Sequence, residues 1–245
     1  MSEPGPTAES RHEHHARLRR EVALGCRIVA AEGHDDLVWG HVSARDPRGR
    51  GAWMKAAGLG FEEVRDGDVI LVDRAGEVLE GAGRRHIEFP IHTEILAARP
   101  DVGAVVHSHP QHAVALAAAG EPLRPVSHAA TLFVPPEVPR FTQTADLITT
   151  PALGRAVAGT LGAQDAMFLV NHGLVTVGRD VPDAVVRAVL LERACAVQLE
   201  VRAHGGRPTW SSPAEALAKR ESVYPPQARR DAWDYLVRRI EAAGA

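Results

Sequence analysis

The sequence predicts a single α/β domain whose strands are joined in meanders more often than in strict strand–helix–strand alternation. Its 245 residues are 45% apolar, which is enough to bury the core of one sizeable domain, and no internal repeat or linker divides them. Segments with a helical period are interspersed with short runs rich in Val and Ile, several of them separated only by turn residues. The expected domain spans residues 1–245, with residues 1–15 as a flexible, polar N-terminal segment.

The N-terminal part is predicted to hold one helix followed by several strands. Apolar residues recur every three or four positions between residues 11 and 32, which indicates an amphipathic helix that ends near Gly33. From residue 37 to residue 81, turn sequences such as Asp-Pro-Arg-Gly and Asp-Gly interrupt short apolar runs and predict hairpin-linked strands. A second helix is expected over residues 88–98, because Pro90 would fall in its first turn, where the missing N–H is tolerated.

The rest of the chain is predicted to hold further strands and helices around a long loop region. Residues 121–150 are rich in Pro and Thr and have no clear period, so we expect a functional loop region with one or two short strands. The other expected elements are a strand at 102–107, a helix at 110–120, a helix at 153–161, strands at 166–170 and 174–177, a helix at 182–203 capped by Asp180, and one further helix near 229–242 in a polar tail.

Charge and composition argue against several classes of partner. The net charge is only -3, and Lys and Arg are scattered among acidic residues, so nucleic acid is not an expected partner. No apolar run approaches the roughly 20 residues of a membrane span, and the N-terminus has no cationic segment followed by an apolar stretch. We therefore expect no membrane partner and a cytoplasmic location. Cys26 and Cys195 lie in helical patterns and are interpreted as buried thiols.

The strongest chemical signal is a pair of histidines at the end of a predicted strand. Side chains alternate along a strand, so His107 and His109 point the same way. One such histidine would more often be a core residue, but two in register favour chelation of a metal. A catalytic metal site needs a third protein ligand, and His172 in an Asn-His-Gly turn is the best candidate. An exposed histidine in a tight turn is the alternative for that residue.

A carboxylate is predicted close to the same place. Glu88 begins the second predicted helix, with His92 one turn later on the same face. A negative charge at a helix N-terminus is favoured by the helix dipole, so a structural cap is the alternative to catalysis. Because this helix leads directly into the strand that bears His107 and His109, we expect Glu88 near the histidines.

Taken together, these residues resemble the class II aldolase and adducin family over roughly residues 19–198. The resemblance is carried by Gly-His-Val-Ser at residues 40–43, by Glu-x-x-x-His at residues 88–92, by Arg-Pro-Asp-Val-x-Ala-Val-Val-His-x-His at residues 99–109, and by the His-Gly pair at residues 172–173. It implies a three-layer α/β/α sandwich around a mixed, largely antiparallel sheet. It also implies a homo-oligomer, a tetramer or higher, with active sites near subunit interfaces.

The resemblance also assigns roles to the candidate residues. It implies that His107, His109 and His172 bind one divalent metal ion per subunit, and that Glu88 is the catalytic acid or base. Three imidazoles suit zinc, while manganese, cobalt or iron could also occupy such a site, and zinc or manganese is expected here.

The sequence departs from the sugar-phosphate aldolases of this family where those enzymes hold phosphate. His41, Ala57-Gly58 and His86-Ile87 stand in place of an Asn, a Thr-Gly or Ser-Gly turn, and a Ser-Ser pair. The nearby cationic groups could instead hold the carboxylates of a small substrate, and Arg could do so through a two-point fork. A solvated pair is the alternative for the two arginines, and a loop histidine for His128. The predicted substrate-binding residues are His41, Ser43, Lys55, Arg84, Arg85, His86 and His128.

These features favour a carboxy-lyase. Gly-His-Val-Ser and Arg-Arg-His-x-Glu, at residues 40–43 and 84–88, resemble a subgroup that decarboxylates hydroxylated aromatic or pyridine dicarboxylic acids. The favoured function is therefore non-oxidative decarboxylation of such an acid. The alternative is an aldolase that acts on a non-phosphorylated hydroxy-keto acid or a sugar-derived substrate. An adducin-like scaffold without activity is a third interpretation, but a scaffold has no need for a buried imidazole cluster.

Overall fold

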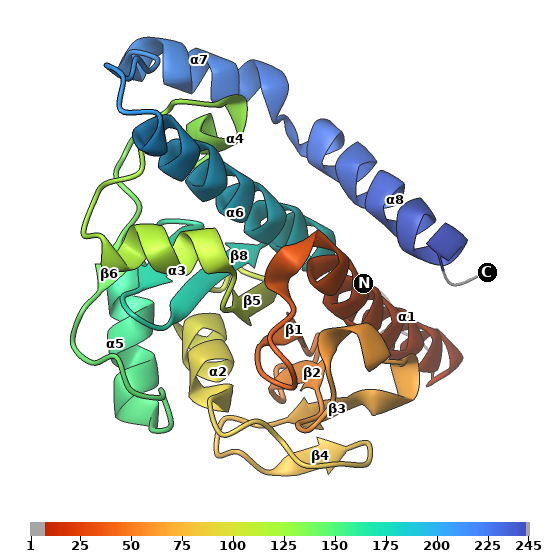
Figure 1. Cartoon of the computed structure of the whole chain (residues 1–245). Coiled ribbons are helices and arrows are strands. Elements are labelled where there is room, and N and C mark those ends of the chain that lie inside the picture. Colours follow the sequence, from red (N-terminus) through yellow and green to blue (C-terminus); the bar gives the residue numbers. More distant parts are fainter. Residues whose placement is uncertain (1–7, 244–245) are drawn as a thin grey trace, which may run out of the picture.

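In the computed structural model, the chain forms one eight-stranded sheet between two layers of helices (Figure 1). The structure describes residues 8–243, with side chains from residue 13 onward. Neighbouring strands in the order β4-β3-β2-β1-β5-β8-β7-β6 are antiparallel except for the parallel pair β6 and β7, which confirms the expected mixed, three-layer α/β/α fold. The strands are β1 (His41–Arg45), β2 (Ala52–Lys55), β3 (Val69–Val72), β4 (Val78–Glu80), β5 (Ala104–Ser108), β6 (Arg140–Phe141), β7 (Ala166–Leu169) and β8 (Gly173–Gly178).

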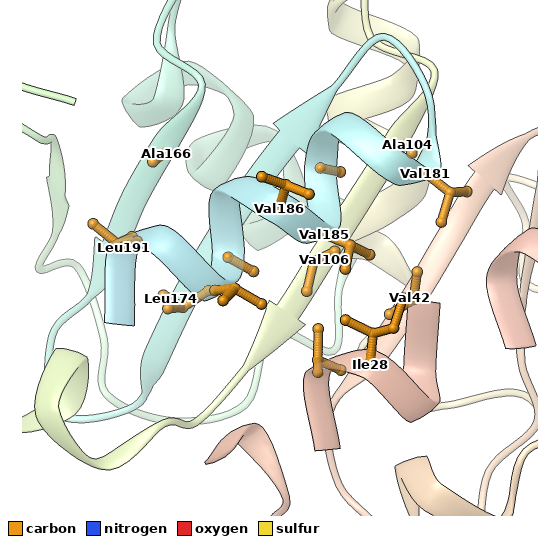
Figure 2. Packing of buried hydrophobic residues seen from close by; sticks show 14 of the residues in the cluster. Ile28, Val42, Ala104, Val106, Ala166, Leu174, Val181, Val185, Val186 and Leu191 are labelled. Atoms are coloured by element: carbon orange, nitrogen blue, oxygen red, sulfur yellow. The ribbon is translucent and has the colours of Figure 1, made fainter. Parts of the chain in front are cut away.

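One face of the sheet is covered by α1 (Ala8–Val29), α3 (Gln111–Ala118) and α6 (Val181–Ala203). Figure 2 shows valines of α6 packed on Val106 of β5 and Val42 of β1. The side chain of Asp180 accepts a hydrogen bond from the backbone N–H of Asp183, which confirms the predicted cap of α6.

The opposite face is covered by α2 (Phe89–Ala98) and α5 (Pro151–Leu161), which pack closely against each other. A Cβ at Gly154 would lie 2.6 Å from the backbone oxygen of Pro90, so glycine permits this approach. Because α2 lies along β5, its N-terminal end is held beside the end of that strand.

Three segments differ from the sequence-based expectations. The first helix begins at Ala8, within the segment expected to be flexible, while residues 1–7 lie outside the described residues. The loop region at 121–150 contains the short helix α4 (His128–Thr131) as well as β6. The polar tail holds two helices, α7 (Pro213–Val223) and α8 (Pro226–Ala243), where one was expected, so that prediction was wrong.

Shorter features connect these elements. α1 runs into a π-helical turn, Ala30–His34, in which Gly33 has a φ of 86°, a conformation that favours glycine. Two 3-10 turns, Phe61–Glu63 and Asp66–Asp68, lie between β2 and β3. Both cysteines are buried and free, as expected. Within residues 8–243, no helix combines the length and apolar character needed to cross a membrane.

Candidate metal centre and active site

Three imidazoles and one carboxylate converge where β5 ends. Glu88, His107, His109 and His172 each offer a ligand atom, and these four atoms lie within 4.8 Å of one another. The Nε2 atoms of His107 and His109 are 3.1 Å apart. The carboxylate of Glu88 lies 3.7 Å from Nε2 of His107 and 3.6 Å from Nε2 of His172. The structure therefore brings together all four residues expected at this site.

The fold positions each of these side chains through the backbone. His107 is the fourth residue of β5 and is paired with His41 on β1 and with Val175 on β8. His109 follows directly after the end of that strand. His172 lies in the turn between β7 and β8, where Asn171 has a φ of 59°, a left-handed conformation that asparagine tolerates. The site is thus built at the ends of central strands.

Hydrogen bonds fix which nitrogen of two imidazoles carries the proton. Nδ1 of His107 donates to the backbone oxygen of Leu174 at 2.9 Å, and Nδ1 of His109 donates to Oδ2 of Asp36 at 2.8 Å. Both acceptors lack a proton to give, so each Nδ1 carries a hydrogen, and Nε2 is the nitrogen that presents the lone pair in the neutral form of each ring. The two lone pairs face one common point.

This arrangement fits a divalent cation. Burial, together with the neighbouring His107, holds the pKa of His109 below its usual value, so its imidazole is neutral and its Nε2 carries no proton. Both ring nitrogens of His172 are buried and have no hydrogen-bond partner within residues 13–243. A metal ion bound to the three Nε2 atoms would give Nε2 of His172 a partner, and imidazole with carboxylate is a common donor set for zinc and manganese.

The side chain of Glu88 contacts the histidine cluster and does not cap its own helix. Its side chain makes no capping bond to α2, and Oε1 instead accepts a hydrogen bond from the backbone N–H of Ile148 at 2.7 Å. Burial alone would raise the pKa of Glu88, but the imidazoles of His107 and His172 and the N–H of Ile148 outweigh burial and hold that pKa well below its usual range. The group is therefore a carboxylate, the form that can act as a base or as a metal ligand.

A second group of histidines lies against the first. Nδ1 of His41 and Nε2 of His92 are 2.6 Å apart, and the hydroxyl of Ser43 is 2.6 Å from Nδ1 of His92. The ring of His41 also lies near the rings of His86 and His107, with centroids 4.6 Å and 5.0 Å away. His92 is fully buried and burial lowers its pKa to about 3, so it is neutral. Among the predicted substrate-binding residues, His41, Ser43 and His86 thus lie beside the candidate metal ligands.

The cationic residues predicted to bind the substrate, Lys55, Arg84 and Arg85, have different surroundings, and Lys55 is the most buried of them. Lys55 follows Met54, which is paired with Ser43, so its side chain leaves the opposite face of the sheet from Ser43. Its amine is buried and donates to the backbone oxygens of Val38, at 3.0 Å, and Leu59, at 2.5 Å. The Lys55 amine is therefore bonded to two backbone oxygens inside the protein.

The two arginines have different surroundings. Nε of Arg85 donates to the backbone oxygen of Gly76 at 2.6 Å, and its guanidinium lies 4.4 Å from the centre of the Phe89 ring. Arg84 is exposed and its guanidinium lies near Gly58. Of the two, Arg84 is therefore the more exposed to solvent. His128 begins α4, is exposed, and belongs to an element that packs on α6 and α7.

Asp36 and His92 are site residues whose contacts were not anticipated. No pattern marks Asp36, which lies in a loop 73 positions before His109. His92 was expected to share a helix face with Glu88, but its partners on β1 depend on how the sheet places that strand beside α2.

Comparison with known proteins agrees with this architecture. A sequence model described as the class II aldolase and adducin N-terminal domain matches residues 20–199. The chain is 32% identical to a 3,4-dihydroxyphthalate decarboxylase of Arthrobacter keyseri over 242 residues, which covers 94% of this chain and 96% of that protein. It is 35% identical over 205 residues to decarboxylase NovR of Streptomyces niveus, covering 82% of this chain and 75% of that protein.

A solved structure gives the same assignment. An L-fuculose 1-phosphate aldolase from Glaciozyma antarctica PI12 superposes with a TM-score of 0.84 at 30% identity and covers 98% of this chain and 94% of its own. The sequence model, the identities and the fold agree over most of the chain, and this protein belongs to the class II aldolase and adducin family.

Proposed function

We propose that this protein is a metal-dependent carbon–carbon lyase that removes carbon dioxide, without oxidation, from a hydroxylated aromatic or pyridine carboxylic acid. The observation that carries the proposal is the convergence of three imidazoles and the carboxylate of Glu88 on one point. The similarity to 3,4-dihydroxyphthalate decarboxylases of Arthrobacter keyseri and of Terrabacter, each at 32% identity, supports decarboxylation over the other lyase reactions.

The ligand set would be Nε2 of His107, His109 and His172, with Glu88 beside them. A divalent cation, zinc or manganese, supplies a Lewis acid for substrate oxygens when it is bound. Release of carbon dioxide leaves an electron pair on the ring carbon, and that carbon must take up one proton. Glu88 is ionised before the reaction, so it would first take this proton from water or from a substrate hydroxyl. Because Oε1 already accepts from the N–H of Ile148, Oε2 is the oxygen that would receive the proton and pass it to the ring carbon.

The second histidine group would orient the substrate. Nδ1 of His41 is engaged by His92, so Nε2 is the nitrogen of His41 that remains for a substrate oxygen. His86 lies beside His41, and Nε2 of His86 has no hydrogen-bond partner within residues 13–243. An anionic carboxylate or hydroxyl oxygen would satisfy such N–H groups. Arg84 would approach the same substrate from the surface.

We propose that the site operates in a homo-oligomer. Leu37, Val38 and Trp39 directly follow Asp36, and 73%, 38% and 53% of their respective surfaces are exposed. Three consecutive apolar side chains exposed beside a catalytic centre support a subunit interface there. A tetramer is the state expected from the family resemblance.

An aldolase is the second candidate. It is favoured by the close superposition on the L-fuculose 1-phosphate aldolase of Glaciozyma antarctica. The same residues would then stabilise an enolate formed from a hydroxy-keto acid. His41 and the residues at 57–58 and 86–87 differ from a phosphate-binding arrangement, which argues for a substrate without phosphate.

The test combines metal analysis with product analysis. The purified protein would be assayed for bound metal and then screened with dihydroxyphthalates, hydroxybenzoates and pyridine dicarboxylates for release of carbon dioxide. Aldehyde formation from a hydroxy-keto acid would instead establish the aldolase. His109→Ala should lose both bound metal and turnover, whereas His204→Ala, at an exposed position, should retain both. Full turnover in His109→Ala would refute the assignment.

A further inference from the structure

We infer that Asp36, in the loop after α1, is a positioning residue for His109: its carboxylate orients that imidazole and strengthens cation binding at the cluster. The inference rests on the metal site of the proposed function. It concerns a residue outside the ligand set, and it predicts how tightly the ligand set holds its metal.

The contact has the geometry of a carboxylate that supports a metal-binding histidine. Oδ2 of Asp36 lies 2.8 Å from Nδ1 of His109, on the side of the ring opposite the cluster. A carboxylate can only accept, so Nδ1 keeps its proton and Nε2 keeps its lone pair. Metal-binding histidines commonly donate their outer N–H to such a group.

The three candidate imidazoles differ in this respect. The outer nitrogen of His107 donates to a neutral backbone oxygen, that of Leu174. Neither nitrogen of His172 has a hydrogen-bond partner within residues 13–243. The carboxylate of Asp36, bonded to His109, therefore adds a negative charge beside the cluster. Together with Glu88, Asp36 would offset the two positive charges of a divalent ion.

The loop that carries Asp36 is fixed to the same strand end by a second contact. Nδ1 of His34 lies 2.8 Å from the hydroxyl of Ser108, and both residues are buried. Ser108 directly precedes His109, so the two contacts join the same two segments within three residues of each other. The backbone N–H of Trp39 donates to the backbone oxygen of Asp36 at 3.0 Å and closes a turn around the acid. The carboxylate is thus delivered to His109 by an ordered loop.

This arrangement distinguishes the contact from an ordinary surface ion pair. Exposed pairs contribute little because solvent screens them and both side chains lose freedom. Here the side chain of His109 is only 16% exposed and its loop is already anchored, although the side chain of Asp36 is 38% exposed. Removing such an outer partner typically weakens metal binding by about 10- to 100-fold.

Asp35 provides a matched control. It carries the same charge one position earlier, is exposed, and has no hydrogen bond from its side chain within the described part of the chain. A general electrostatic effect of the acidic loop would act through both residues, whereas positioning acts only through Asp36. Asp36→Asn offers a conservative variant, because its amide oxygen can still accept from Nδ1.

The experiment measures metal affinity and not turnover. Metal-free wild type, Asp36→Ala, Asp36→Asn and Asp35→Ala would be titrated with zinc and with manganese in competition with a chromophoric chelator. Thermal unfolding of the metal-free proteins would establish that all are folded. We expect Asp36→Ala to bind about 10- to 100-fold more weakly than wild type. Asp36→Asn should recover part of that loss, and Asp35→Ala should match wild type.

The outcomes separate this inference from the proposed function. If wild type binds zinc and Asp36→Ala binds it as tightly as Asp35→Ala, the positioning role is overturned while the metal site stands. If wild type binds neither cation, the proposed function is overturned and this inference with it.

Discussion

Four buried neutral histidines make the metal-free protein sensitive to acid. Burial lowers the pKa values of His34, His86 and His92 to about 3, and that of His41 lies well below its usual value for the same reason. In the unfolded chain each imidazole titrates near 6.5. Between pH 6.5 and 3 the unfolded state therefore binds more protons, so the free energy of unfolding falls as the pH falls.

The size of this effect follows from the three residues whose pKa values are near 3. At pH 5.5, one unit below the unfolded value, each such imidazole lowers the free energy of unfolding by about 1.4 kcal/mol. The three together remove about 4 kcal/mol, a large share of the roughly 5–15 kcal/mol that stabilises a typical domain.

Urea unfolding at pH 7.5 and pH 5.5, in the presence of a chelator, measures the loss. His34→Gln isolates one contribution, because a glutamine can still bond to the hydroxyl of Ser108 but cannot titrate. The drop between the two pH values should be smaller in this variant by about 1.4 kcal/mol. His204→Gln, at an exposed position, should show the same drop as wild type. An equal drop in wild type and His34→Gln would show that His34 is not buried neutral.

Three further predictions test packing, substrate binding and chemistry. Gly154→Ala should lower the free energy of unfolding by about 1–3 kcal/mol, because its Cβ meets the backbone of Pro90. Gly159 lies on the same helix but faces open space, so Gly159→Ala should raise the free energy of unfolding by about 0.5–1 kcal/mol. Arg84→Ala should raise KM without changing metal affinity, whereas Arg85→Ala should mainly lower the melting temperature, since it loses the bond to Gly76; identical kinetics in wild type and Arg84→Ala would remove Arg84 from the substrate site. Glu88→Gln should keep its metal and lose about 10²- to 10⁴-fold of turnover, measured as carbon dioxide release.

Local patterns were enough to predict most of the sheet and its main helices. The apolar period, the turn residues and the cap at Asp180 all depend on neighbours within a few positions, and the structure agrees with them. The four-residue cluster around Glu88 was accessible for a related reason. Alternation along β5 orients His107, and a tight turn between two strands carries His172 back to the same end of the sheet.

Features that depend on distant contacts were not accessible. The bond between Asp36 and His109 joins residues 73 positions apart, and no local period encodes it. α7 was missed because its sequence is polar and buries a single residue, Ala216, within the described chain. Its signal was present, however, since Ser212 and Glu215 form a reciprocal capping box on either side of Pro213, the first residue of the helix.

The turn that follows α1 is joined to two helices from much later in the sequence, α6 and α8. Arg193 of α6 and Arg239 of α8 both bind the carboxylate of Glu32, beside the π-helical turn that leads to Asp36. Because Arg239 follows Glu32 by 207 residues, the pair between them can form only after α8 has been synthesised.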